Sequence, residues 1–277
     1  LRGMLESVER LVEALKRNQQ IVIVGDFDAD GATSSALMML ALSAMGFKKV
    51  EFLVPNRFDF GYGLTPEIVD LATQYNPDLI ITVDNGTSSI DGVDHASSLG
   101  VDVIVTDHHL PGEKLPNACA IVNPNQPGCS FPAKNLAGVG VAFYLLSGLR
   151  AELRRIGWFD LNQLVEPNMA TWLDLVALGT VADVVPLDQV NRTLVHQGLL
   201  RIRSGLCRPG IRALLQIAGK NPKRLVAADL GFAVGPRLNA AGRLDDISLG
   251  IQCLLTEDMD VALQAAESLD QLNKDRR

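Results

Sequence analysis

Short apolar runs alternate with helical patterns over the first 135 residues of the chain. The runs are rich in valine and isoleucine and carry few charges, which is typical of strands buried on both faces of a parallel sheet. They predict strands at residues 21–24, 50–54, 79–83, 101–105 and 120–122. The stretches between them predict helices at residues 5–17, 33–45, 66–75 and 88–99, and Thr65 before Pro66 marks one helix start.

The pattern changes after about residue 135, where predicted helices follow one another with no clear strand run between them. These helices lie near residues 139–156, 168–182, 192–203, 209–218, 246–255 and 258–277. We therefore expect an α/β fold, with a parallel β-sheet flanked by helices, followed by a mainly helical C-terminal segment. We place the first unit at residues 1–190 and the helical segment at residues 191–277. Because the last helix has no stop signal, we expect the natural chain to continue into further domains.

Composition narrows the classes of protein to consider. The chain is 47% hydrophobic and 21% charged, as in an ordinary globular protein, and its longest apolar run, residues 36–42, is too short for a membrane span. The first 18 residues lack the apolar core of a signal peptide, and the four cysteines form no C-x-x-C pair. We therefore expect a cytoplasmic protein that contacts no membrane.

Charge is distributed unevenly along the chain. The net charge of −7 by itself argues weakly against nucleic-acid binding. Residues 201–224, however, include seven basic residues and no acidic one. This segment either follows a DNA backbone or forms the solvated face of a helix, and the sequence leaves both alternatives open.

Acidic and histidine side chains follow three of the predicted strands, at the point where each strand ends. They are Asp26, Asp28, Asp30, Asp84, Asp107, His108 and His109. The carboxyl ends of parallel strands meet at one edge of a sheet, so we expect these side chains to lie close together. Such a set of negative charges is costly unless cations compensate it. Oxygen and imidazole ligands in this number suit two Mn²⁺ or Mg²⁺ ions, a combination typical of phosphoester hydrolysis.

Other interpretations account for less of this pattern. A single Asp after a strand also suits a turn or a helix cap, but one helix start does not need three. An EF-hand loop requires a preceding helix and a Glu at its twelfth position, where this chain has Leu37. A phosphatase of the haloacid dehalogenase type also places D-x-D after a strand, but it leaves His108 and His109 unexplained.

Four segments resemble motifs of one known family, the DHH phosphoesterases. Residues 107–109 resemble the Asp-His-His motif that names the family, and residues 26–31 and 83–86 resemble its first and second motifs. Residues 175–183 resemble a later motif whose Asp completes the metal site. The RecJ branch of the family is indicated by residues 55–57, 61–64, 136–140 and 235–243. The resemblance thus covers essentially the whole chain.

The resemblance implies a metal site with five main ligands. They are Asp28, Asp30, Asp84, His108 and Asp183. Asp84 would bridge two ions. Many relatives have a further histidine where this chain has Val24, which leaves Asp26 as a possible substitute ligand. Asp174 is an alternative to Asp183, although it fits better as a helix-start residue.

The same resemblance assigns the catalytic roles. The residues concerned are His109, Asp84, Asp28 and Asp30. His109 would face the scissile phosphate, and Asp107 would support the histidines from behind. The metal ions would activate a water that attacks the phosphorus in line.

Several further residues are candidates for binding the substrate. They are Arg57, Asn85, Gly138, Gly140, Arg237, Asn239 and Arg243, with Tyr62 as a possible nucleotide contact. Residues 235–243 are expected to form a loop whose arginines bind phosphate, or else a purely structural loop. Gly138 and Gly140 either let backbone N–H groups approach phosphate before a helix at Val141, or serve close packing.

The activity implied by the resemblance is that of a 5′→3′ exonuclease specific for single-stranded DNA, which releases 5′-mononucleotides and acts in DNA repair and recombination. Single-strand-binding protein and a helicase are possible partners. One alternative is a phosphodiesterase of the same family that acts on short oligonucleotides or cyclic dinucleotides. Another is a non-catalytic DNA-binding or scaffold relative, which we would expect to have lost the metal ligands.

Overall fold

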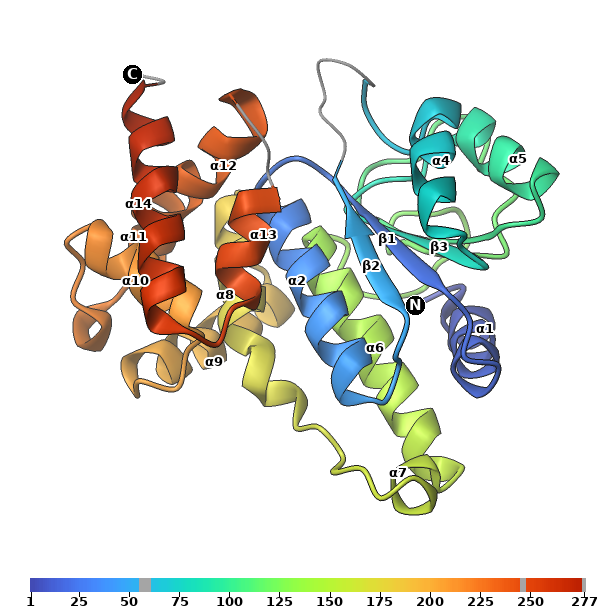
Figure 1. The fold of residues 1–277 in the computed structure, drawn as a ribbon, viewed down its shortest axis with the longest axis horizontal. Coiled ribbons are helices and arrows are strands. Elements are labelled where there is room, and N and C mark those ends of the chain that lie inside the picture. Colours follow the sequence, from blue (N-terminus) through green and yellow to red (C-terminus); the bar gives the residue numbers. More distant parts are fainter. Residues whose placement is uncertain (55–60, 245–247, 276–277) are drawn as a thin grey trace.

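The sheet has five parallel strands and contains every strand that the sequence predicts. The computed structural model describes residues 1–54, 61–244 and 248–275, except for the side chains of residues 243 and 244. The strands lie in the order β2-β1-β3-β4-β5 (Figure 1). Their bounds are β1 Ile21–Gly25, β2 Val50–Leu53, β3 Leu79–Val83, β4 Asp102–Thr106 and β5 Ala120–Val122. Gly25 pairs with Val83, and Val83 pairs with Thr106, so β1, β3 and β4 end level with one another.

Alternate residues of each strand face two different layers of helices. Ile21 and Ile23 belong to the core on the side of α2 (Ala29–Ala44), α6 (Gly138–Arg155) and α1 (Met4–Lys16). Val22 and Val24 point the other way, into a core formed with α4 (Pro66–Ala72) and α5 (Ile90–Ser98). Burial on both faces explains why the strands are continuous apolar runs without polar alternation.

The second half of the chain is helical, as predicted. Its α-helices are α7 Trp158–Leu161, α8 Leu173–Ala182, α9 Gln189–Arg203, α10 Pro209–Ile217, α11 Ala227–Asp229, α12 Gly235–Leu244, α13 Ser248–Leu255 and α14 Met259–Asp275. Short 3-10 turns lie at Thr73–Tyr75, Met169–Trp172 and Pro222–Arg224, and a π-helical turn lies at Leu230–Val234. Helices α8, α12 and α13 pack against α2, so this half lies beside the sheet domain (Figure 1).

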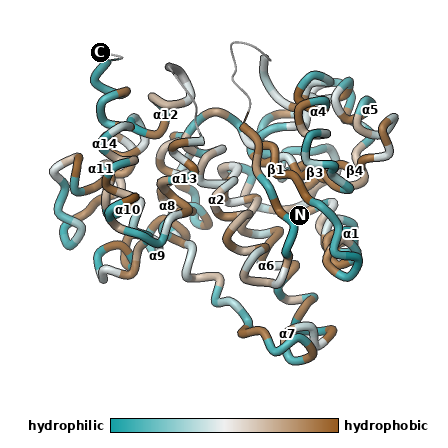
Figure 2. The backbone as a smooth tube through the Cα atoms, viewed as in Figure 1, coloured by the Kyte–Doolittle hydropathy of each residue, from teal (hydrophilic) through white to brown (hydrophobic). Residues whose placement is uncertain are grey.

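One hydrophobic core runs from the sheet through α2 into the helical half. Figure 2 shows apolar backbone along β1, β3, α2, α6 and α8, with polar stretches on the outer helices. The proposed division at residue 190 stays a prediction. Among the residues that the structure describes, none of the helices combines the length and the apolar composition needed to cross a bilayer.

The prediction of a loop at residues 235–243 was wrong, because this segment lies within helix α12. Leu238, Ala240 and Ala241 are buried at spacings that suit one helix face. The glycines serve close packing and not a turn: a Cβ on Gly242 would lie 1.8 Å from the backbone oxygen of Phe27. The likeness of Gly and Pro to turn residues therefore misled the prediction.

Candidate active site

The loop after β1 delivers three carboxylates within five residues. Asp28 caps helix α2, and its Oδ1 accepts a hydrogen bond from the backbone N–H of Gly31 at 2.9 Å. Asp30 lies in the first turn of α2 and is directed at the start of α6. Its carboxylate accepts the N–H groups of Gly138 at 2.6 Å and Val139 at 2.9 Å. Asp30 therefore caps a helix that begins more than a hundred residues later in the chain.

Asp84 follows β3 in a left-handed backbone conformation, with φ of 62°. Such a conformation is uncommon for a residue with a side chain and is found most often at functional sites. The turn is held by Asn85, whose amide donates to the backbone oxygens of Val24 at 3.1 Å and Val83 at 2.9 Å. Asn85 thus ties together the ends of β1 and β3, and its amide N–H groups are committed to the backbone.

The loop after β4 is organised around Asp107. One carboxylate oxygen accepts the backbone N–H of His108 at 2.7 Å and also lies 2.7 Å from Nδ1 of His109. The other oxygen accepts the N–H of Thr87 at 2.9 Å. Burial alone would raise the pKa of Asp107, but the hydrogen bonds from His109 and Thr87 lower it to about 2. The structure therefore places Asp107 behind the two histidines, where the sequence predicted it.

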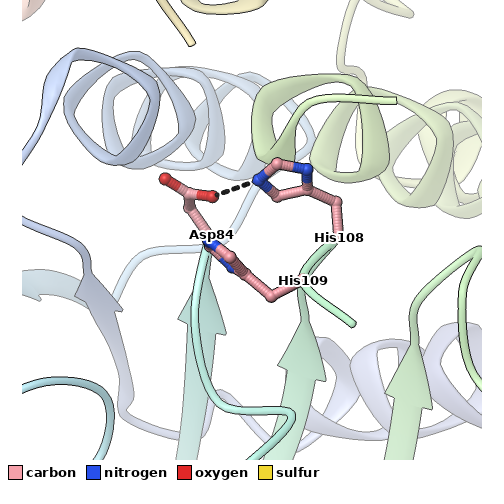
Figure 3. A group of neighbouring side chains, drawn as sticks. All are labelled: Asp84, His108 and His109. Carbon is pink, nitrogen blue, oxygen red and sulfur yellow. Dashed lines mark ion pairs between the residues drawn. The ribbon is translucent and has the colours of Figure 1, made fainter. Parts of the chain in front are cut away.

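The side chains from these loops converge. Figure 3 shows Asp84 and His108 directed toward each other, with Nε2 of His108 lying 3.1 Å from Oδ1 of Asp84. The same nitrogen lies 3.5 Å from Asp183, which ends helix α8, and 3.9 Å from Asp30. The sequence therefore located both the three strand ends and the distant Asp183.

Three overlapping groups of side chains have ligand atoms that all lie within 4.8 Å of one another. The groups are Asp26, Asp28 and Asp84; Asp30, His108 and Asp183; and Asp84, His108 and His109. Asp84 belongs to two of them, as a residue that bridges two ions must. Asp26 belongs to the group that would need it as a ligand in place of the histidine missing at Val24.

The electrostatics of this cluster call for cations. Burial, and then the neighbouring Asp28, raises the pKa of Asp26 to about 7. Burial and nearby carboxylates likewise raise the pKa of Asp30, Asp84 and Asp183, because each charge is desolvated and lies among others of the same sign. Oδ1 of Asp84 and Nε2 of His108 are also buried without a hydrogen-bond partner. Two divalent ions would satisfy these atoms and neutralise the carboxylates.

Asp174, the alternative ligand, lies elsewhere. It is buried in the first turn of α8, where its carboxylate accepts the backbone N–H groups of Arg208 and Leu175, each at 2.8 Å. It belongs to none of the ligand groups among the described residues. Its role as a helix-start residue, favoured by the sequence, is confirmed.

The candidate substrate-binding glycines have structural partners. Helix α6 begins at Gly138 and not at Val141, and the N–H of Gly138 is bonded to Asp30. A Cβ on Gly138 would lie 2.7 Å from the Cβ of Asp84, so this glycine lets α6 approach the cluster. A Cβ on Gly140 would lie 3.0 Å from Leu136, which indicates close packing. Of the two alternatives, the structure favours packing for both.

The candidates in residues 235–243 form one side of the site. Oδ1 of Asn239 accepts the N–H of Ala29 at 2.7 Å, which holds α12 against the start of α2. Arg237 forms a 2.7 Å ion pair with Asp270 of α14 and is largely buried. Its guanidinium is therefore committed within the protein in this conformation. Arg57 and the side chain of Arg243 lie outside the described residues.

The basic segment 201–224 divides into paired and unpaired cations. Arg208 is buried against Glu257 and Lys220 pairs with Asp229. Within the described part of the chain, the other five have no carboxylate partner. The segment lies on α9, α10 and the turn after them, away from the sheet (Figure 1).

Sequence reasoning missed two asparagines that follow β5. Asn123 donates to the backbone oxygen of His109 at 2.9 Å, and Asn125 donates to that of His108 at 2.7 Å. Both therefore fix the loop that carries the histidines. The available signal was their position, since they follow directly the strand that neighbours β4.

Comparison with known proteins agrees with this geometry. The sequence model described as "DHH family, N-terminal domain" matches residues 20–180. The chain is 61% identical over 277 residues to the single-stranded-DNA-specific exonuclease RecJ of Dickeya dadantii and 58% identical to that of Escherichia coli. Each alignment covers 100% of this chain and 48% of the relative, so the chain spans about half the length of these proteins.

Solved structures agree as well. A crystal structure of exonuclease RecJ bound to manganese matches with a TM-score of 0.86 and 36% identity, over 100% of this chain and 66% of that one. RecJ from Thermus thermophilus in complex with Mn²⁺ matches with a TM-score of 0.82 and 35% identity, over 100% of this chain and 38% of that one. From its sequence motifs, its fold and its clustered carboxylates and histidines, the chain belongs to the DHH family.

Proposed function

We propose that this chain is the catalytic part of a metal-dependent exonuclease that degrades single-stranded DNA in the 5′→3′ direction and releases 5′-mononucleotides. One observation carries the proposal: Oδ1 of Asp84 and Nε2 of His108 are buried, unpartnered and surrounded by carboxylates whose pKa values are raised. The high identity to RecJ exonucleases supports the choice of substrate and of Mn²⁺ or Mg²⁺ as the ions.

The chain's residues divide the work among them. The ligands would be Asp28, Asp30, Asp84, His108 and Asp183, with Asp26 as a sixth. Two ions held there supply a hydroxide nucleophile at neutral pH and neutralise charge on the phosphate oxygens. Asp84, shared by two ligand groups, sets the spacing between the two positions.

His109 is the group placed to meet the substrate. Its side chain is 46% exposed, and its Nδ1 is held by Asp107 at 2.7 Å. That contact orients the ring and leaves Nε2 as the nitrogen free to donate to a phosphate oxygen of the strand.

Some finer assignments belong to the same proposal. Residues 1–190 form the catalytic domain and residues 191–277 lead toward the rest of a longer enzyme. Arg57 and Arg243 are the arginines proposed to bind the DNA phosphates. The protein would act in the cytoplasm, in DNA repair and recombination, together with a single-strand-binding protein and a helicase.

The test compares the wild type with Asp84→Asn, which keeps the side-chain shape and tolerates the left-handed backbone. Single strands labelled at one end and blocked at the 5′ or 3′ end are digested with Mn²⁺ or with a chelator. Asp94→Asn, an exposed residue of α5, is the matched control. We expect Mn²⁺-dependent release of mononucleotides by the wild type and the control only, and only from strands with an open 5′ end. Equal activity of Asp84→Asn, or turnover of dinucleotides alone, would reject the proposal.

A further inference from the structure

A cavity of about 360 Å³ opens beside the candidate catalytic histidine. Its wall includes Asp107 and His109 on one element, Tyr62 on a second, and the turn and first residues of α5 on a third. The turn begins two residues after Asp84, so the cavity adjoins the cluster that would hold the scissile phosphate. A strand with its phosphate at the cluster would have a neighbouring nucleoside within reach of this space.

The chemistry of the wall excludes a phosphate as the occupant. The described residues that line the cavity include no lysine or arginine, whereas Asp91 and Asp107 are both present. An anion would therefore be repelled. The exposed hydroxyl of Ser88 and the carboxylate of Asp91 are instead suited to hydrogen bonds with an uncharged, polar group. The sugar and the base of a nucleotide are groups of this kind.

Tyr62 offers a flat surface for a base. Its side chain is 51% exposed, in a molecule where aromatic residues are only 5% of the total. The ring is held edge-on by Phe27, with centroids 6.3 Å apart, and by His109, with centroids 5.8 Å apart. Its hydroxyl lies 3.2 Å from Nδ1 of His109. Because it is already positioned, the ring would lose little entropy when a base stacks on it.

The floor of the cavity is rigid. The backbone N–H of Leu64 donates to Oγ of Ser89 at 2.9 Å, which joins the two sides. A Cβ on Gly92 would lie 1.9 Å from the backbone oxygen of Leu64, so α5 packs directly against this segment. The space is preformed, and it lies at the small end of the range of about 300–1,000 Å³ for ligand pockets. Such a volume suits one nucleoside and not two.

We propose that this cavity is the subsite for the terminal nucleoside of the strand, with Tyr62 stacking on its base and Ser88 and Asp91 meeting its polar edge. This assignment rests on the proposed exonuclease function and adds a physical reason for release of one nucleotide at a time. The phosphate that follows the bound nucleoside is then the one at the metal cluster.

The first test removes the stacking partner from each side in turn. Tyr62→Ala is expected to raise KM about tenfold on an ordinary strand, within the range known for base–aromatic stacking. On a strand whose terminal nucleotide lacks its base, the same variant should leave KM unchanged. Tyr62→Phe keeps the ring, so it should retain the wild-type KM and show only the effect of the lost hydroxyl on kcat. A loss in KM that is equal on both strands would overturn the proposal.

The second test fills the cavity and needs no metal. Ser88→Trp places a large side chain in the space, and Ser97→Trp puts the same side chain on an exposed position of the same helix. Fluorescence of 2-aminopurine deoxyriboside should be quenched by the wild type and by Ser97→Trp, and not by Ser88→Trp. Quenching that is unchanged in Ser88→Trp would refute the subsite. A wild type that quenches the nucleoside but digests no strand would instead refute the exonuclease function.

Discussion

Gly138→Ala is the sharpest test of how the second half of the chain shapes the site. The added methyl would lie 2.7 Å from both Cβ and Oδ1 of Asp84. Carbon atoms in contact normally lie about 3.5–4.0 Å apart, so Asp84 or the start of α6 must move by about 1 Å. Misplacement of a catalytic group by about 1 Å costs roughly 100-fold in rate. We therefore expect kcat/KM to fall about 100-fold, equivalent to about 2.7 kcal/mol of transition-state stabilisation.

The assay combines exonuclease kinetics with calorimetric titration of Mn²⁺, since a displaced Asp84 should weaken both. Gly148→Ala is the matched control on the same helix: there the methyl would meet only the flexible end of Met4, at 3.0 Å. We expect the control to keep full activity, with stability equal to or above that of the wild type, because Ala favours helix over Gly. If Gly138→Ala binds Mn²⁺ and digests DNA as well as the control, the close approach of α6 to Asp84 has no functional role.

Three further outcomes follow from contacts around the site and in the core. Asp107→Asn should lower kcat/KM about 10- to 100-fold with little change in melting temperature, since it orients His109 without being a ligand; unchanged kinetics would contradict this role. Arg208→Met should lower the free energy of unfolding in urea by about 3 kcal/mol, because it leaves carbonyl groups at the end of α13 unpaired; a loss below about 1 kcal/mol would contradict it. Burial raises the pKa of Asp174 above its ordinary value of 3.8, so its contribution to stability is present at low pH and is lost as pH rises through the folded-state pKa. Asp174→Asn should therefore gain stability relative to the wild type as pH rises from that value toward neutrality, and a constant difference would count against it.

The strands and their catalytic ends could be predicted because both depend on local sequence. A continuous run such as Ile21–Gly25 is apolar because helices cover both faces of a parallel sheet. The residue after such a strand lies at the carboxyl edge wherever the strand sits in the sheet. This is why Asp28, Asp84 and His108 were identified without knowledge of the strand order.

Segments that owe their form to distant neighbours could not be predicted in this way. Gly and Pro in residues 235–243 suggested a loop, but packing against α2 and Phe27 makes the segment a helix whose Gly242 permits close approach. Arg237 looked like a free phosphate-binding residue, yet Asp270 pairs with it from α14. Neither partner can be recognised from the residues near it in sequence.

The sequence by itself therefore determined the strands, the chemistry of the ligands and the family, because buried strands and strand-end carboxylates leave local patterns. Only the tertiary structure decided how Asp30 caps α6, how Gly138 admits Asp84, and that an uncharged cavity adjoins His109. Each of these depends on distances between segments that are far apart in the chain. Such distances are set by the packing of whole helices against the sheet, which no local pattern encodes.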